Sequence, residues 1–180
     1  MRKLLLSAGL ALALVPFLAA AAAAQGDCLG TSGSATVNGN PWTATCVLGA
    51  TAPDCVDSLG TEYECFEVVG ISTDTQFQSV SIFLTGPPAQ GMTYGLGGTS
   101  GNGAMVVGGA GFFITADAPY TGEIQVTRYE SAGGIIECNF SFEARSLFGP
   151  GSAVVSAGQF AGRLVPVAPV TWSTVKNRYR

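Results

Sequence analysis

The chain contains the stretch IECNFSFEA at residues 136–144, in which apolar and polar residues alternate without exception. Successive side chains of a β-strand point to opposite faces, so this pattern predicts a strand with one buried and one solvated face. We expect its cysteine and its two phenylalanines to point into a core. The run EIQVT at residues 123–127 alternates too, and the Gly-containing residues 131–134 between the two runs predict a hairpin.

Short runs of β-branched and aromatic residues recur after residue 24, separated by Gly, Pro, Ser and Asp, and helical periodicity is almost absent. They predict further strands at residues 35–37, 42–47, 63–71, 78–85, 92–95, 104–115 and 152–164. The sequence NGNP at residues 38–41 predicts a turn that either makes a tight hairpin or bends one long strand. The predicted fold class is all-β: an antiparallel meander of about eight or nine strands, closing as a barrel or sandwich.

Residues 1–24 have the composition of a secretory signal peptide. A basic start (Arg2, Lys3) precedes a long apolar run, and an alanine tract ends at Ala24, after which we expect cleavage. An uncleaved anchor is the alternative, because the apolar run is long enough to span a bilayer. Lipid attachment is not expected, since Asp27 precedes the first cysteine where a small residue is needed. We expect an exported chain in the periplasm, at the cell surface or outside the cell, with no stable membrane insertion after cleavage.

The composition of the processed chain is acidic. Without residues 1–24, six Lys and Arg face twelve Asp and Glu, which gives a net charge of −6. An acidic body repels phosphate backbones, and no basic patch with interleaved aromatics lies within it, so nucleic-acid binding is not expected. The expected partner is instead an envelope or extracellular component.

Five cysteines form the set of disulfide candidates: Cys28, Cys46, Cys55, Cys65 and Cys138. In an oxidising compartment they are expected to pair, and the odd number leaves at least one thiol free or joined to another chain. Two bridges among five cysteines can be drawn in many ways, so the connectivity stays open. A zinc site is the competing interpretation, but the sequence has no C-x-x-C and no histidine.

The processed chain has a length suited to one all-β domain, at residues 25–164. Residues 165–170 contain two prolines and predict an extended linker, because Pro continues neither a helix nor a central strand. Residues 171–180 then form a separate basic tail whose apolar residues fall at helical spacing, which predicts a short amphipathic helix formed on meeting a partner or surface. The candidate docking residues of this tail are Trp172, Val175, Lys176, Tyr179 and Arg180.

Four motifs carry a resemblance to a known group: VNG at 37–39 with WTA at 42–44, GEIQVTRY at 122–129, FSFEA at 140–144, and the closing run at 155–160. In this order they resemble small bacterial secreted and lipoprotein all-β domains of unknown function. The resemblance implies an extracytoplasmic β meander and no known catalytic residues. The chain departs from the group in having several cysteines and no lipobox.

The tail resembles terminal segments of some exported bacterial proteins that carry W-x-x-(I/V)-K-x-x-Y-R after a variable linker. Such an element would be read by export or surface-attachment machinery. A disordered end and an additional edge strand are the alternatives.

The absence of histidine excludes Ser-His-Asp and Cys-His catalysis and His-ligated metals. The densest acidic group comprises Glu62, Glu64, Glu67, Asp54 and Asp57. It fits a carboxylate pair for glycoside hydrolysis, a Ca²⁺ site with loop 51–61, or an ordinary acidic loop beside a disulfide. We expect the last of these, and therefore no enzyme activity, no metal and no cofactor.

The structural role of the glycine-rich segments and the placement of the aromatic side chains are left open by the sequence. Residues 95–103 are Gly-rich but lack a P-loop lysine, so they predict a flexible loop and no phosphate site. Gly108, Gly109 and Gly111 predict a bulge or a sharply bent strand, and the alternative is that they clear space for a ligand. The aromatic residues available to line a cavity or to fill the core are Trp42, Phe66, Phe112, Phe113, Phe140 and Phe142.

Two functions follow from this sequence. The first is an exported, non-enzymatic β-domain that acts as a binding or structural module at the cell envelope or outside the cell. The second is a lipocalin-like carrier of a small apolar ligand. A carrier needs a roomy interior, whereas a module has a closed core.

Overall fold

The computed structural model describes residues 28–56, 62–131 and 134–165, except for the side chains of residues 52–56 and 62–63. The predicted signal peptide at 1–24, the linker beyond residue 165 and the tail at 171–180 lie outside the described residues, as do the side chains of Asp54, Cys55, Asp57 and Glu62. These predictions therefore stay predictions.

The described chain is all-β, as predicted, and has eleven strands where eight or nine were expected. They are β1 (Ser32–Val37), β2 (Asn40–Ala44), β3 (Cys46–Val56), β4 (Glu62–Ile71), β5 (Ser79–Leu84), β6 (Thr93–Leu96), β7 (Gly103–Gly108), β8 (Gly111–Ile114), β9 (Gly122–Tyr129), β10 (Ile135–Ser146) and β11 (Ser152–Leu164). Two predicted strands are each divided: residues 42–47 at Thr45, and residues 104–115 at a turn.

All eleven strands belong to one sheet, in the order β2-β1-β11-β3-β4-β5-β7-β8-β10-β9-β6. An additional pairing of β11 with β10 closes seven of them into a hydrogen-bonded ring. The pairing of β11 with β3 is parallel, at Arg163–Leu48 and Leu164–Gly49. The sheet is therefore mixed. The other pairings are antiparallel, and four of them (β1–β11, β5–β7, β8–β10 and β6–β9) join strands that are not consecutive in the chain.

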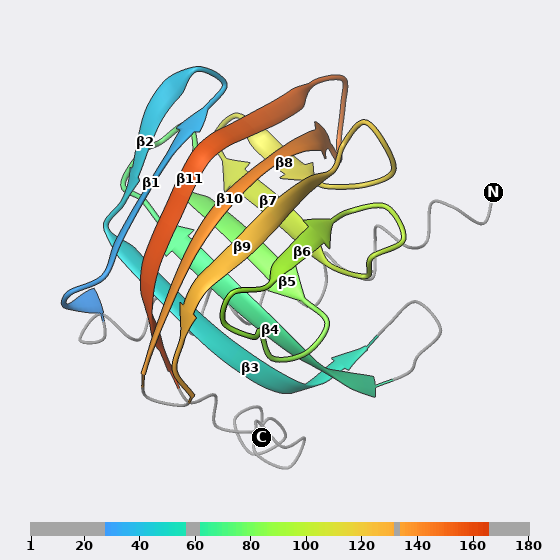
Figure 1. Ribbon diagram of the computed structural model, residues 1–180. Coiled ribbons are helices and arrows are strands. Elements are labelled where there is room, and N and C mark those ends of the chain that lie inside the picture. The colour runs from blue at the N-terminus through green and yellow to red at the C-terminus, as the bar shows by residue number, and fades with distance from the viewer. Residues whose placement is uncertain (1–27, 57–61, 132–133, 166–180) are drawn as a thin grey trace, which may run out of the picture.

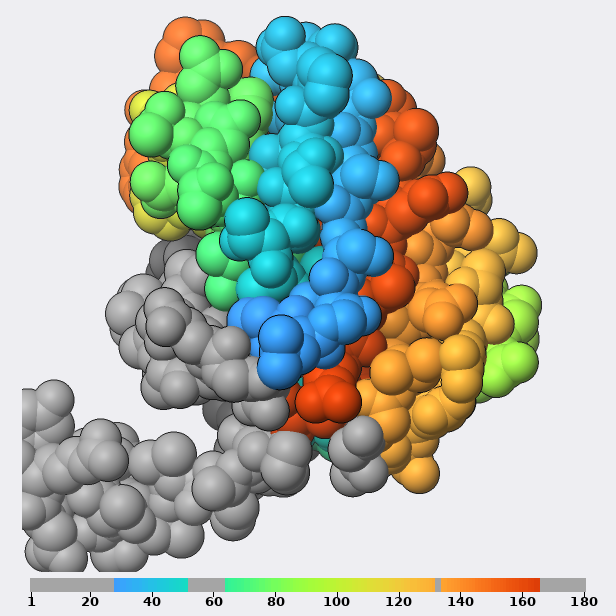
Figure 2. Space-filling view, turned by 90° about the vertical axis from the view of Figure 1, so that its left-hand side faces the viewer, coloured from blue at the N-terminus to red at the C-terminus, as the bar shows by residue number. Residues whose placement is uncertain are grey.

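The sheet folds over itself into two layers (Figure 1). The front layer consists of β2, β1, β11, β10, β9 and β6, and the back layer of β3, β4, β5, β7 and β8. The long strands β10 and β11 connect the layers, because each pairs with a front-layer strand along its length and with a back-layer strand near its C-terminal end. Figure 2 shows the β1–β2 hairpin at one edge of the front layer, beside β11.

The space between the layers is filled by one large hydrophobic core. The three inward residues predicted in the 136–144 stretch, Cys138, Phe140 and Phe142, are all buried there. Trp42 on β2 is 2% exposed, and its Nε1 donates a hydrogen bond of 2.7 Å to the carbonyl oxygen of Phe77, which precedes β5. A single side chain thus joins the front layer to the back layer by packing and by a hydrogen bond.

Two hairpins answer questions that the sequence left open. Asn38 and Gly39 have φ of 50° and 80°, the left-handed values of a two-residue turn, so this segment makes a tight hairpin between β1 and β2. β7 and β8 pair from Met105–Ile114 to Gly108–Gly111, so the bulge or bent strand predicted for Gly108, Gly109 and Gly111 is wrong. A Cβ on Gly108 would lie 2.0 Å from the carbonyl oxygen of Gln76. Glycine at this position therefore leaves the space that the loop containing Gln76 occupies.

Glycine at position 70 sets how closely the two layers approach. A Cβ there would lie 2.6 Å from Cε1 of Phe160 and 2.9 Å from Cη2 of Trp42, whereas a Cβ on Gly95 of β6 would meet nothing within 4 Å. We predict that Gly70→Ala lowers the free energy of unfolding by about 1–3 kcal/mol, because the added methyl overpacks the core. Gly95→Ala is the matched control and should change it by less than about 0.5 kcal/mol. Urea denaturation measures both, and equal effects would contradict this account.

Candidate functional site

The outer face of the front layer carries a row of uncharged polar side chains. Strand register places Thr43 opposite Ser34, Ser34 opposite Gln159, Gln159 opposite Asn139, Asn139 opposite Gln125, and Gln125 opposite Thr93. The row therefore crosses six neighbouring strands, and all six side chains are exposed. We call this set the polar row.

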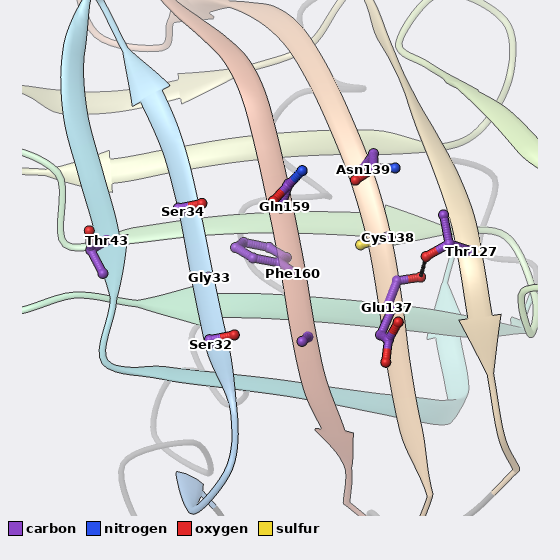
Figure 3. Close-up of a pocket in the computed structure, with 11 residues that line it drawn as sticks. Ser32, Gly33, Ser34, Thr43, Thr127, Glu137, Cys138, Asn139, Gln159 and Phe160 are labelled. Atoms are coloured by element: carbon purple, nitrogen blue, oxygen red, sulfur yellow. Dashed lines mark hydrogen bonds between the residues drawn. The ribbon is translucent and has the colours of Figure 1, made fainter.

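An open groove of about 450 Å³ follows the centre of the polar row. It lies across β2, β1, β11, β10 and β9, and Figure 3 shows its polar side chains on one side of these strands. Phe160 and Cys138, which also line it, come from the core side of the same strands. Binding pockets for small ligands have volumes of about 300–1,000 Å³, so the groove is large enough to hold part of a polar molecule.

The groove is lined mainly by hydroxyl and amide groups, with one carboxylate, that of Glu137. No side chain of the polar row has a hydrogen-bond partner among the residues that the structure describes. Beside the row, Thr127 Oγ1 donates a hydrogen bond of 3.0 Å to the carbonyl oxygen of Glu137, and the Glu137 carboxylate pairs with Arg128. The hydroxyl and amide groups of the row are thus available to a ligand, while a neighbouring charge is already paired.

The polar row was not predicted from the sequence. Each strand contributes one Ser, Thr, Asn or Gln to it, and such residues are ordinary on the solvent face of a strand. Their alignment depends on the register of strands far apart in the chain, for which no local pattern exists. The signal available in the sequence was the shortage of charged residues, which make up 11% of the chain.

The cysteines divide into bonded and free groups. Cys28 and Cys46 form a disulfide, with their Cα atoms 4.9 Å apart, and Cys65 is also disulfide-bonded. Cys138 is a free thiol in the core, and burial raises its pKa to about 12. Its burial opposes an intermolecular disulfide through this residue. Disulfide formation is thus confirmed, and it is consistent with an oxidising compartment.

We predict that non-reducing peptide mapping finds Cys28 linked to Cys46 and Cys55 linked to Cys65. Strand register supports the second link, because Cys55 lies opposite Tyr63 and Ala52 opposite Cys65 on the neighbouring strand. Cys138 should resist iodoacetamide at pH 8, because a thiol with a pKa of about 12 stays protonated there, and it should react after unfolding. A bridge that includes Cys138 would contradict the assignment.

The acidic group does not form a shared site in the described part of the chain. Glu64 is exposed, whereas Glu67 is 6% exposed on the opposite face of β4. Burial raises the pKa of Glu67 to about 8. The described residues hold no group of three or more His, Cys, Asp and Glu that could bind a metal ion. The loop expected at 51–61 is also wrong in part, because β3 continues to Val56.

The Gly-rich segment 95–103 comprises the end of β6, a hydrogen-bonded turn at residues 97–102 and the first residue of β7, where the sequence predicted a flexible loop. Asn102 organises it: its Oδ1 accepts a hydrogen bond of 2.9 Å from the Thr85 amide, and its Nδ2 donates one of 3.1 Å to the Gly95 carbonyl. Of the six aromatics considered for a cavity or a core, five are buried. Phe112 is the exception, being 42% exposed and in edge contact with the Phe148 ring.

Comparison of the chain with protein-family models, with curated proteins and with solved structures found no match. Within the described residues, no helix has the length and apolar character needed to cross a membrane.

Proposed function

We propose that this protein is an exported, non-enzymatic binding module that holds a neutral, hydroxyl-rich polymer, such as a polysaccharide, at the cell envelope or outside the cell. The polar row and its groove form the binding face. The observation that carries the proposal is the alignment across six strands of six exposed, uncharged polar side chains that have no hydrogen-bond partner within the described part of the chain.

The spacing of the row suits an extended polar ligand. Neighbouring strands lie about 4.8 Å apart, so the row offers a hydrogen-bonding group at each such interval over about 24 Å. A neutral polymer brings hydroxyl donors and acceptors at short intervals and carries no charge that needs a counterion. A charged ligand would find the groups of the row without a complementary charge, so the row favours a neutral one.

The packing between the layers supports a binding module over a carrier. Phe66, Ile82, Ile124 and Ile136 are less than 2% exposed in the middle of the core. The Phe140 and Phe160 rings approach to 4.5 Å between centroids. Large side chains thus occupy the interior that a lipocalin-like carrier would need for its ligand.

Two observations support the remaining parts of the proposal. The disulfides fit an oxidising location outside the cytoplasm, which agrees with the predicted signal peptide. The chain has no histidine, and Glu67, the described carboxyl group with a strongly raised pKa, lies on the outer face of the back layer, away from the groove. A binding role without catalysis fits this distribution.

The test is affinity electrophoresis of the processed chain in gels that contain dextran, mannan or amylose, with dextran sulfate and chitosan as charged polymers. We expect retardation by at least one neutral polymer. The triple variant Ser34→Ala, Asn139→Ala, Gln159→Ala should weaken that binding about tenfold or more, because three hydrogen bonds of about 0.5–1.5 kcal/mol each are removed.

The control variant is Thr73→Ala, Gln76→Ala, Gln78→Ala, which removes one hydroxyl and two amides from an exposed loop and strand end away from the groove. It should bind as the unmodified chain does. Binding to charged polymers alone, or equal binding by the two triple variants, would refute the proposed face.

A further inference from the structure

The outer face of the back layer differs from the polar row in being apolar and closed to solvent. Strand register places Leu48, Val69, Ser81, Met105 and Ile114 side by side across β3, β4, β5, β7 and β8. Val69 is 1% exposed and Ser81 is fully buried. An apolar sheet face of this size is costly to leave in water, so we expect it to be covered.

The described residues that pack against this face lie at its margins. Its two small hydrophobic clusters pack against Cys28, Ile71 and Val165 at one side, and against Phe83 and Leu147 at the other. Val165 is the last described residue, and its amide donates a hydrogen bond of 2.8 Å to the carbonyl oxygen of Gly49 on β3. The chain therefore leaves β11 at the edge of this apolar face.

Two polar groups lie within the apolar face. Glu67 is buried between Ala50 and Phe83, which are its neighbours in register. Ser81 lies diagonally from it, and its hydroxyl interacts with the Glu67 carboxyl group and lowers the pKa that burial raises, although Ser81 Oγ makes no hydrogen bond of ordinary geometry with a described residue. A buried carboxyl group whose polar neighbour is a single serine hydroxyl is costly unless a further polar group meets it. Whatever covers this face is expected to bring such a group.

We propose that the C-terminal segment Thr171–Arg180 docks on the outer face of the back layer as a short amphipathic helix, with Lys176 directed to Glu67 and Ser81. The apolar positions of the segment, Trp172, Val175 and Tyr179, share one helical face with Lys176, because these residues are spaced i, i+3, i+4 and i+7. A cation within an apolar stripe thus meets a carboxyl group within an apolar sheet face.

The length of the chain beyond Val165 fits this placement. Gly49, which holds the Val165 amide, pairs with Val68 of β4, the residue next to Glu67. The five residues 166–170 span up to about 17 Å when extended, which exceeds the strand separation of about 4.8 Å several times. A ten-residue helix is about 15 Å long, so it covers about three strand spacings. Neither the linker nor the helix has to be strained to reach the face.

Hydrogen–deuterium exchange with mass spectrometry of the processed chain, which begins at Gln25, tests this inference. We expect protected amides in peptides from residues 171–180. Truncation after Val170 and the variant Lys176→Met should each speed exchange at least tenfold in peptides from β4 and β5. Peptides from β10 should be unchanged, because that strand lies in the front layer.

The matched control is Arg178→Met, which removes a cation from the opposite side of the predicted helix and should leave exchange in β4 and β5 unchanged. Combining Glu67→Gln with Lys176→Met should add little to either single variant, because both remove the same pair. If the truncated chain fails to fold, Lys176→Met and Arg178→Met still decide the question.

Three results would overturn the proposal. The first is unprotected exchange throughout residues 171–180. The second is equal behaviour of Lys176→Met and Arg178→Met. The third is protection of β4 and β5 that disappears on dilution together with a change from dimer to monomer in light scattering, which would assign the face to a second copy of the chain. None of these results bears on the polar row, so the two proposals fail independently.

Discussion

The contact of Trp42 and Phe160 with Gly70 is the constraint on which the two-layer structure depends. The first two residues belong to the front layer and the third to β4 of the back layer, and the closeness of the contact leaves no space for a Cβ on the glycine. The hydrogen bond from Trp42 to the Phe77 carbonyl fixes the same edge of the core. Because interiors are close-packed, this contact fixes the position of β1, β2 and β11 relative to β4. The groove on the front layer lies directly outside these strands.

The two outer faces of the domain differ in the polarity of their side chains. Front-layer strands such as β10 alternate between core residues and polar residues, as expected for a sheet with one wet face. β4 and β5 change to apolar residues on both faces, and Val68 and Val69 are both buried. A strand that is apolar on both faces indicates a sheet covered on both sides. The domain therefore has one polar, solvated outer face and one apolar outer face.

Local sequence patterns predicted the strands. They did not predict the features of the fold that depend on contacts between residues far apart in the chain. The alternation at residues 136–144 and the Asn38-Gly39 turn depend on near neighbours, so both could be read from the sequence. The division of residues 104–115 depends on the Gln76 loop packing on Gly108, and the parallel pair of β11 with β3 joins residues more than a hundred positions apart. The polar row depends on the same distant registers. No single-strand pattern contains this information.

Glu67 illustrates why composition alone misjudges a site. In the sequence it belongs to an acidic cluster with Glu62 and Glu64, and charged residues are usually solvated. In the structure it occupies the apolar face, where burial rather than a neighbouring charge raises its pKa. A carboxyl group in such a place is either protonated or paired with a cation, because an unpaired buried charge is too costly. The only lysine beyond residue 3 is Lys176, eleven residues after Val165, which is the last described residue and lies beside this face. The same shortage of charge that leaves the polar row neutral thus underlies the proposed pairing of this lysine with Glu67.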